Sequence, residues 1–169
     1  ELGFDARKMT GNKWFETQDQ IAYHSEFEKE KVVWTPVNSE YSFAIIPSGV
    51  YFVNSVFMIT GSKIKMFCGI FNSIFIRYYL TFLFSSEEEY TYASKEIMKK
   101  IPLPSITSSN EQLVTQIELL VDKIITAKKQ NPQADTSALE REIDNLVYKL
   151  YDLTPAEINI IESNIKKRN

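Results

Sequence analysis

The most apolar stretch of the chain, residues 64–84, limits the folds open to this sequence. Its large apolar side chains recur at the spacing of one helix face, namely Met66, Phe67, Ile70, Ile74, Phe75 and Tyr78. Lys65, Asn72 and Arg77 interrupt the stretch, and charged side chains are costly inside a membrane span. We therefore expect a long amphipathic helix buried in a protein core, and no membrane contact.

Short strands are expected around this helix. Residues 31–34, 42–46 and 50–60 are rich in β-branched and aromatic side chains and are separated by turn-forming residues. A further short strand is expected at residues 90–92, followed by a short helix that Ser94 caps and Pro102 ends. The sequence therefore predicts an α+β fold in which a small mixed β-sheet accompanies the long buried helix.

The remainder of the chain, residues 108–169, has almost no aromatic residues and is expected to be helical throughout. Three helix starts match the capping box of a hydroxyl residue followed by a carboxylate, and they begin at Ser108, Ser137 and Thr154. Because the linker between the first two helices is short, we expect an antiparallel pair. The proline-rich residues 101–104 predict a boundary between a domain at 1–104 and a helical spacer at 105–169.

Charge and cysteine content restrict the partners and the compartment. The net charge is −3, and neither part is basic, so strong autonomous binding to nucleic acid is not expected. A domain that reads bases while another domain holds the backbone still fits. Cys68 is the only cysteine and cannot form an internal disulfide, which favours a reducing, cytoplasmic setting. The chain begins at Glu1 without a methionine, and we interpret it as a fragment of a longer protein.

Patterns of catalytic chemistry are missing from the sequence. His24 is the only histidine, so a zinc site made of several His or Cys side chains is not expected. No two of the five glycines lie close enough to form a phosphate-binding loop. Asn131-Pro132 lacks the Pro-Tyr of an adenine methyltransferase loop, and no Lys has Asp or Glu two residues before it, as a nuclease core would. We predict no catalytic residue, no metal site and no cofactor in this chain.

Several segments, taken in order, resemble one known family, the TaqI-like C-terminal specificity domain. Those that resemble its opening, central strands, helix and closing motif are residues 14–18 (WFETQ), 27–34 (FEKEKVVW), 42–44 (SFA), 51–61 (YFVNSVFMITG), 70–73 (IFNS) and 101–104 (IPLP). Residues 135–154 are similar to the helical end of many type IIG restriction-modification enzymes. The loop at 85–93 departs from the family, since it carries an acidic run where small residues and glycine are expected.

The resemblance implies a function that the residues alone do not. It implies a target-recognition domain that reads double-stranded DNA. An upstream domain of the same polypeptide would bind S-adenosylmethionine and methylate a flipped adenine. The parent would be a site-specific adenine DNA-methyltransferase, with or without endonuclease activity, and residues 108–169 would act as a spacer or form a homodimer. Two alternatives stay open: a helical protein-interaction module without DNA contact, and an enzyme with a dispersed site.

The DNA-facing residues are expected in the loops at the two ends of the long helix. A helix that must bury its apolar stripe cannot itself lie in a groove, whereas the adjoining loops carry hydroxyl and ammonium donors for phosphate oxygens. The predicted DNA-binding residues are Lys63 before the helix and Ser85, Tyr92, Ser94 and Lys95 after it. The alternative for these residues is ordinary surface polarity, with Ser94 as a helix cap.

Overall fold

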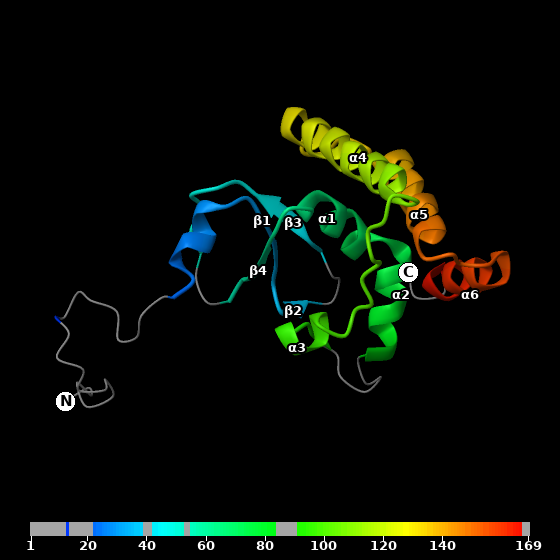
Figure 1. Cartoon of the computed structure of the whole chain (residues 1–169), viewed down its shortest axis with the longest axis horizontal. Coiled ribbons are helices and arrows are strands. Elements are labelled where there is room, and N and C mark those ends of the chain that lie inside the picture. The colour runs from blue at the N-terminus through cyan, green and yellow to red at the C-terminus, as the bar shows by residue number, and fades with distance from the viewer. Residues whose placement is uncertain (1–12, 14–21, 39–41, 53–54, 84–90, 167–169) are drawn as a thin grey trace.

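The fold combines a small β-sheet with a layer of helices, which confirms the predicted α+β class (Figure 1). The computed structural model describes residues 13, 22–38, 42–52, 55–83 and 91–166. In chain order the elements are η2 (His24–Glu28), β1 (Lys31–Trp34), β2 (Val37–Asn38), β3 (Ala44–Ile46), β4 (Phe57–Thr60), α1 (Ile64–Asn72), α2 (Ile74–Leu83), β5 (Thr91–Tyr92), α3 (Lys95–Met98), α4 (Glu111–Gln130), α5 (Ser137–Leu150) and α6 (Pro155–Lys166).

The main sheet has the strand order β3-β1-β4, and a smaller sheet pairs β2 with β5. All the pairings among the described strands are antiparallel, so the sheet is not mixed as the sequence had suggested. Every residue of the central strand β1 is buried. Its Lys31 is wholly buried, and its ammonium donates to the carbonyl oxygens of Pro47 at 3.1 Å and Val50 at 3.4 Å. These contacts satisfy a cation that would otherwise be costly to bury.

The predicted long helix is interrupted at Ser73, which separates α1 from α2. Ser73 has extended backbone angles of φ −66° and ψ 152°. Its hydroxyl oxygen accepts a hydrogen bond from the N–H of Ile76 at 3.3 Å, and the carboxylate of Asp144 accepts one from the N–H of Ile74 at 2.8 Å. These two acceptors satisfy N–H groups that a helix start leaves without an intrahelical partner. Ser73 therefore acts as the N-cap of α2, and the apolar stretch forms two helices.

Helices α4 and α5 form the expected antiparallel pair, and α4 also packs along α1 (Figure 1). Gly69 of α1 lies at this contact, because a Cβ there would be 2.7 Å from Cγ2 of Ile117 and 3.2 Å from Cγ2 of Val121. Helix α6 packs against α2. Buried residues on both sides of residue 104, among them Trp34, Phe43, Ile117 and Val147, belong to one continuous hydrophobic core. The division into two domains at 104 remains a prediction.

The three predicted capping boxes have different outcomes. At α6 the box is complete, since Thr154 donates from its N–H and hydroxyl to the Glu157 carboxylate and accepts the Glu157 N–H. At α5 the prediction is wrong by one residue: Thr136 is the N-cap, and the carboxylate of Asp135 accepts the N–H of Ser137 at 3.0 Å. At α4 it is also wrong, because the helix begins at Glu111 after a turn in which Asn110 accepts the N–H of Thr107.

Candidate nucleic-acid interface

The segment that carries Ser94 and Lys95 is fixed to the sheet by backbone and indole contacts. Residues 91 and 92 form β5, which pairs with β2. The N–H of Ala93 donates to the carbonyl of Pro36 at 2.7 Å, and the indole N–H of Trp34 donates to the carbonyl of Ala93 at 2.8 Å. Ala93 is fully buried. The start of α3 is therefore held in place by the core.

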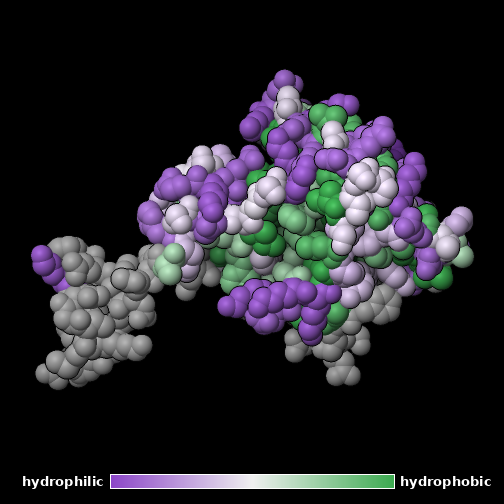
Figure 2. All heavy atoms as spheres, viewed as in Figure 1, coloured by the Kyte–Doolittle hydropathy of each residue, from purple (hydrophilic) through white to green (hydrophobic). Residues whose placement is uncertain are grey.

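Ser94 is a helix cap. Its side-chain oxygen accepts the N–H of Ile97 at 3.3 Å. Lys95 is exposed beside it, as are Lys99 and Lys100, and Lys99 forms an ion pair with Glu96 at 3.0 Å. Figure 2 shows a hydrophilic band over α3. Lys95 and Lys100 thus leave two ammonium groups on this surface that no ion pair among the described residues neutralises.

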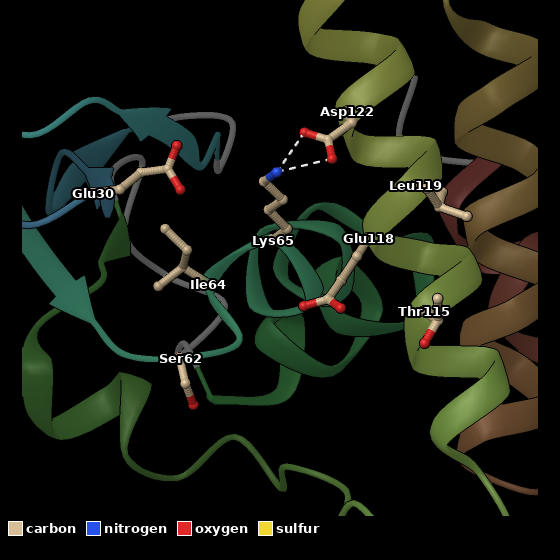
Figure 3. Close-up of a pocket in the computed structure, with 8 residues that line it drawn as sticks. All are labelled: Glu30, Ser62, Ile64, Lys65, Thr115, Glu118, Leu119 and Asp122. Atoms are coloured by element: carbon tan, nitrogen blue, oxygen red, sulfur yellow. Dashed lines mark hydrogen bonds and ion pairs between the residues drawn. The ribbon is translucent and has the colours of Figure 1, made fainter.

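Lys63 lies at the start of α1 and contacts α4. Its ammonium lies 3.2 Å from the carboxylate of Glu118, and the neighbouring Lys65 lies 2.7 Å from that of Asp122. The hydrogen bond from Lys65 to Asp122 is the main cause that raises the lysine's pKa. Lys65, Glu118 and Asp122, with Glu30, line a pocket of about 360 Å³ between α1 and α4 (Figure 3). A phosphate that bound Lys63 would compete with Glu118, so the predicted role of Lys63 requires this ion pair to open.

The other predicted residues are only partly placed. Ser85 lies outside the described residues, and for Tyr92 the structure describes its position in β5 but not its side chain. Within the described part of the chain, no hydrogen bond or ion pair joins Lys63 to Ser94 or Lys95. The five residues therefore stay a prediction, of which Tyr92, Ser94 and Lys95 lie on one segment.

A second cationic surface was not predicted. A cleft of about 720 Å³ lies between the α1–α2 junction, β3, α4 and α5. Four cations line it, namely Arg77, Lys128, Lys129 and Arg141. The sequence pattern that could have indicated it is the Lys-Lys pair at 128–129, which follows the apolar Ile124 and Ile125 by four residues on the same helix face. Arg77 and Arg141 come from other helices, so only the fold brings the four together.

Metal and membrane sites find no support in the described residues. No group of three or more His, Cys, Asp or Glu side chains within them is arranged to hold a metal ion. The ring of His24 lies beside Tyr51, with 5.6 Å between the ring centroids. Among the described helices, none is long and apolar enough to cross a membrane.

Comparison with known proteins gives the family. Residues 4–103 match the TaqI-like C-terminal specificity domain, a stretch that includes the sheet, α1, α2 and α3. A search of curated proteins found no match to the chain. The matched residues are more than half of the 169 in the chain, and a specificity domain serves a restriction-modification enzyme by recognising DNA. The chain therefore belongs to the TaqI-like C-terminal specificity domain family, with DNA recognition as its role.

Proposed function

We propose that the chain is the sequence-specific recognition module of a restriction-modification methyltransferase. It positions duplex DNA so that another domain of the same polypeptide, which binds S-adenosylmethionine, methylates an adenine. In a type IIG enzyme the same recognition would also direct an endonuclease. The observation that carries the proposal is the family match over residues 4–103. The fixed segment at α3, with exposed Lys95 and Lys100, supports it because ammonium groups on a rigid element suit phosphate contacts.

The chemistry of the described residues supports a binding role. Cys68 is the only cysteine, and burial raises the pKa of its thiol to about 11, so the reactive thiolate is scarce near neutral pH. Its Sγ donates towards the carbonyl of Phe43 at 3.5 Å, in the core. We propose that the isolated chain transfers no methyl group and cleaves no DNA.

The alternative of a helical assembly module has less support. In that alternative residues 108–169 form an assembly surface, yet the apolar side chains of Val114, Ile117, Val121 and Ile143 are buried in the core that these helices share with α1. The side chain of Leu119 remains 57% exposed. Self-association through this region stays a proposal, to be checked by sedimentation of the chain at rising concentration.

Selection from random duplexes tests the proposed function. The chain is incubated with a library of randomised duplexes at about 50 mM salt, where phosphate contacts are strong, and bound duplexes are sequenced over several rounds. We expect one enriched motif that contains adenine, and a changed affinity when that adenine carries an N6-methyl group. Recovery of duplexes with no enriched motif, in repeated selections, contradicts sequence-specific recognition.

A further inference from the structure

The cation-lined cleft, defined by Arg77, Lys128, Lys129 and Arg141, is built from separate elements. Arg77 comes from α2, the two lysines come from the last turn of α4, and Arg141 comes from the first half of α5. The elements are held together by the core, in which Gly69, Val121 and Ile143 make a close contact. The cations are therefore presented on a rigid frame, although they are far apart in the sequence.

None of these four cations forms a close ion pair among the described residues, although Arg77 lowers the pKa of Asp144, and Arg141 and Lys128 lower that of Asp135, from a longer distance. The ion pairs among the described residues involve Lys29, Lys63, Lys65 and Lys99, and none involves a cation of the cleft. Lys128 donates instead to the carbonyl of Ala134 at 2.7 Å, which directs its ammonium without removing the charge. The cleft also contains two carboxylates, Glu140 and Asp144. Cations therefore outnumber acids there, in a chain whose net charge is −3.

The lining of the cleft also includes apolar side chains, among them Val121, Ile124 and Ile125 of α4. A sugar-phosphate strand offers partners for both parts, because phosphate oxygens accept hydrogen bonds from Lys and Arg and the sugar presents carbon atoms. We propose that the cation-lined cleft contacts the backbone of duplex DNA, so that α4 and α5 hold DNA as well as supporting the recognition fold. This inference rests on the proposed function, since the family match is what identifies DNA as the anionic partner.

The cleft is distinct from the cationic surface at α3. Arg77 lines the cleft, whereas Tyr79, two positions further along α2, donates its hydroxyl to the carbonyl of Lys100 at 3.3 Å. Residues two apart on a helix do not share a face. The contributions of the two surfaces to DNA binding can therefore be measured separately.

Three double variants with the same change in charge test the proposal. They are Lys129→Ala with Arg141→Ala in the cleft, Lys95→Ala with Lys100→Ala at α3, and Lys123→Ala with Lys149→Ala as the control on α4 and α5. All six side chains are exposed, and the control lysines line neither pocket. Thermal unfolding first establishes that each variant is folded. Binding of a mixed-sequence duplex is then measured between about 50 and 200 mM salt.

We expect the cleft variant to flatten the plot of log affinity against log salt by about 2, which is about 0.9 for each lost phosphate contact. The control should keep the slope of the unmodified chain. If the cleft variant keeps that slope as well, the cleft does not hold DNA, while binding by the unmodified chain leaves the proposed function standing. The duplex is titrated to concentrations that detect the weak autonomous binding expected of an acidic chain, and no salt-dependent binding by the unmodified chain under these conditions contradicts both.

Poly-L-glutamate is the second probe, because an acidic protein segment would also suit a cleft lined by cations and apolar side chains. Under the proposal, the cleft variant loses DNA affinity beyond what the control loses. If the cleft variant instead loses affinity for polyglutamate and keeps its salt dependence for DNA, the cleft is a docking site for protein and the proposal is overturned.

Discussion

The carboxylate of Asp144, in the middle of α5, accepts a hydrogen bond of 2.8 Å from the backbone N–H of Ile74, the first residue of α2. This contact joins the C-terminal helices to the point where the long apolar stretch is interrupted. Asp144 is 8% exposed, and burial is the main cause that raises its pKa to about 6, against the lowering effects of Ile74 and Arg77. The Asp144 carboxylate, which accepts a backbone N–H at the start of α2, therefore lies in a site that disfavours its charged form.

Asp144→Asn should remove a pH dependence of stability. The folded-state pKa is raised above 3.8, so the folded protein binds the proton more tightly than the unfolded chain. Stability from this group is therefore fully present below about pH 3.8 and is lost as the pH rises through 6, by at most about 3 kcal/mol. Asparagine still accepts the N–H of Ile74 but does not titrate. Denaturant unfolding at several pH values should show a flatter profile for the variant.

Glu142→Gln, on the exposed face of the same helix, is the matched control for this measurement. It removes one carboxylate without touching α2 and should leave the pH profile of stability close to that of the unmodified chain. If Asp144→Asn retains the full loss of stability between pH 4 and 7, the buried carboxylate is not its origin.

Gly69→Ala should destabilise the contact between α1 and α4. The new Cβ would lie 2.7 Å from Cγ2 of Ile117, which is wholly buried and has little room to move. Overpacking of this kind costs about 1–3 kcal/mol, and against a fully buried Ile117 we expect that cost to exceed the gain of about 1 kcal/mol for replacing glycine inside a helix. We expect a lower free energy of unfolding.

Ile117→Leu removes the β-branch that the new methyl group would meet, and so it provides the partner for a double-mutant cycle. The double variant should be more stable than the sum of the two single effects predicts. If the two changes in unfolding free energy simply add, the strain in Gly69→Ala does not come from the contact with Ile117.

Asn72→Ala should destabilise the junction between α1 and the sheet. Asn72 accepts a hydrogen bond from the N–H of Phe43 at 3.1 Å and donates one to the carbonyl of Phe43 at 2.8 Å. Its amide group therefore makes the two backbone hydrogen bonds that a neighbouring strand would otherwise make. Its loss leaves both backbone groups without this partner, and we expect a cost of about 2 kcal/mol or more in unfolding free energy. Asn145→Ala, at an exposed position of α5, should change stability much less, and equal effects would contradict the assigned role.

Thr154→Ala tests the complete capping box of α6. The variant removes the hydroxyl that bonds Glu157, and loss of such a cap costs about 1 kcal/mol. Ser108→Ala is the comparison, because Ser108 lies in the turn before α4 and does not cap it. Circular dichroism during denaturant unfolding should separate the two, with Ser108→Ala close to the unmodified chain. A larger effect at Ser108 would restore the sequence-based assignment.

Features that depend on neighbouring residues were predictable from the sequence. The strand at residues 31–34, the antiparallel helix pair and the box at Thr154 each follow from a local pattern, and the structure has all three. The N-cap of α5 was predicted at Ser137 but lies at Thr136, and the carboxylate of Asp135 accepts the N–H of Ser137. The local pattern did not distinguish the hydroxyl of Ser137 from the carboxylate of Asp135 as the acceptor at this helix start.

Features that depend on distant residues were not predictable in the same way. The apolar spacing of residues 64–84 runs through Ser73 without a break, and an acceptor that helps to start α2 there comes from Asp144, 70 positions after Ile74. The cation-lined cleft likewise draws on α2, α4 and α5. Lys63 looked available for DNA because nothing near it in the sequence indicates Glu118 as its partner.

The shared core has a consequence for attempts to change the specificity of such enzymes by exchanging segments between relatives. Residues 101–104 look like a natural crossover point, yet the carbonyl of Pro102 accepts a hydrogen bond from the hydroxyl of Tyr151, the residue that follows α5, and Gly69 packs against Ile117 across this point. A chimera joined there would bring together two surfaces that did not evolve against each other. A graft that carries residues 22–166 as one unit keeps these contacts, and is the exchange we expect to fold.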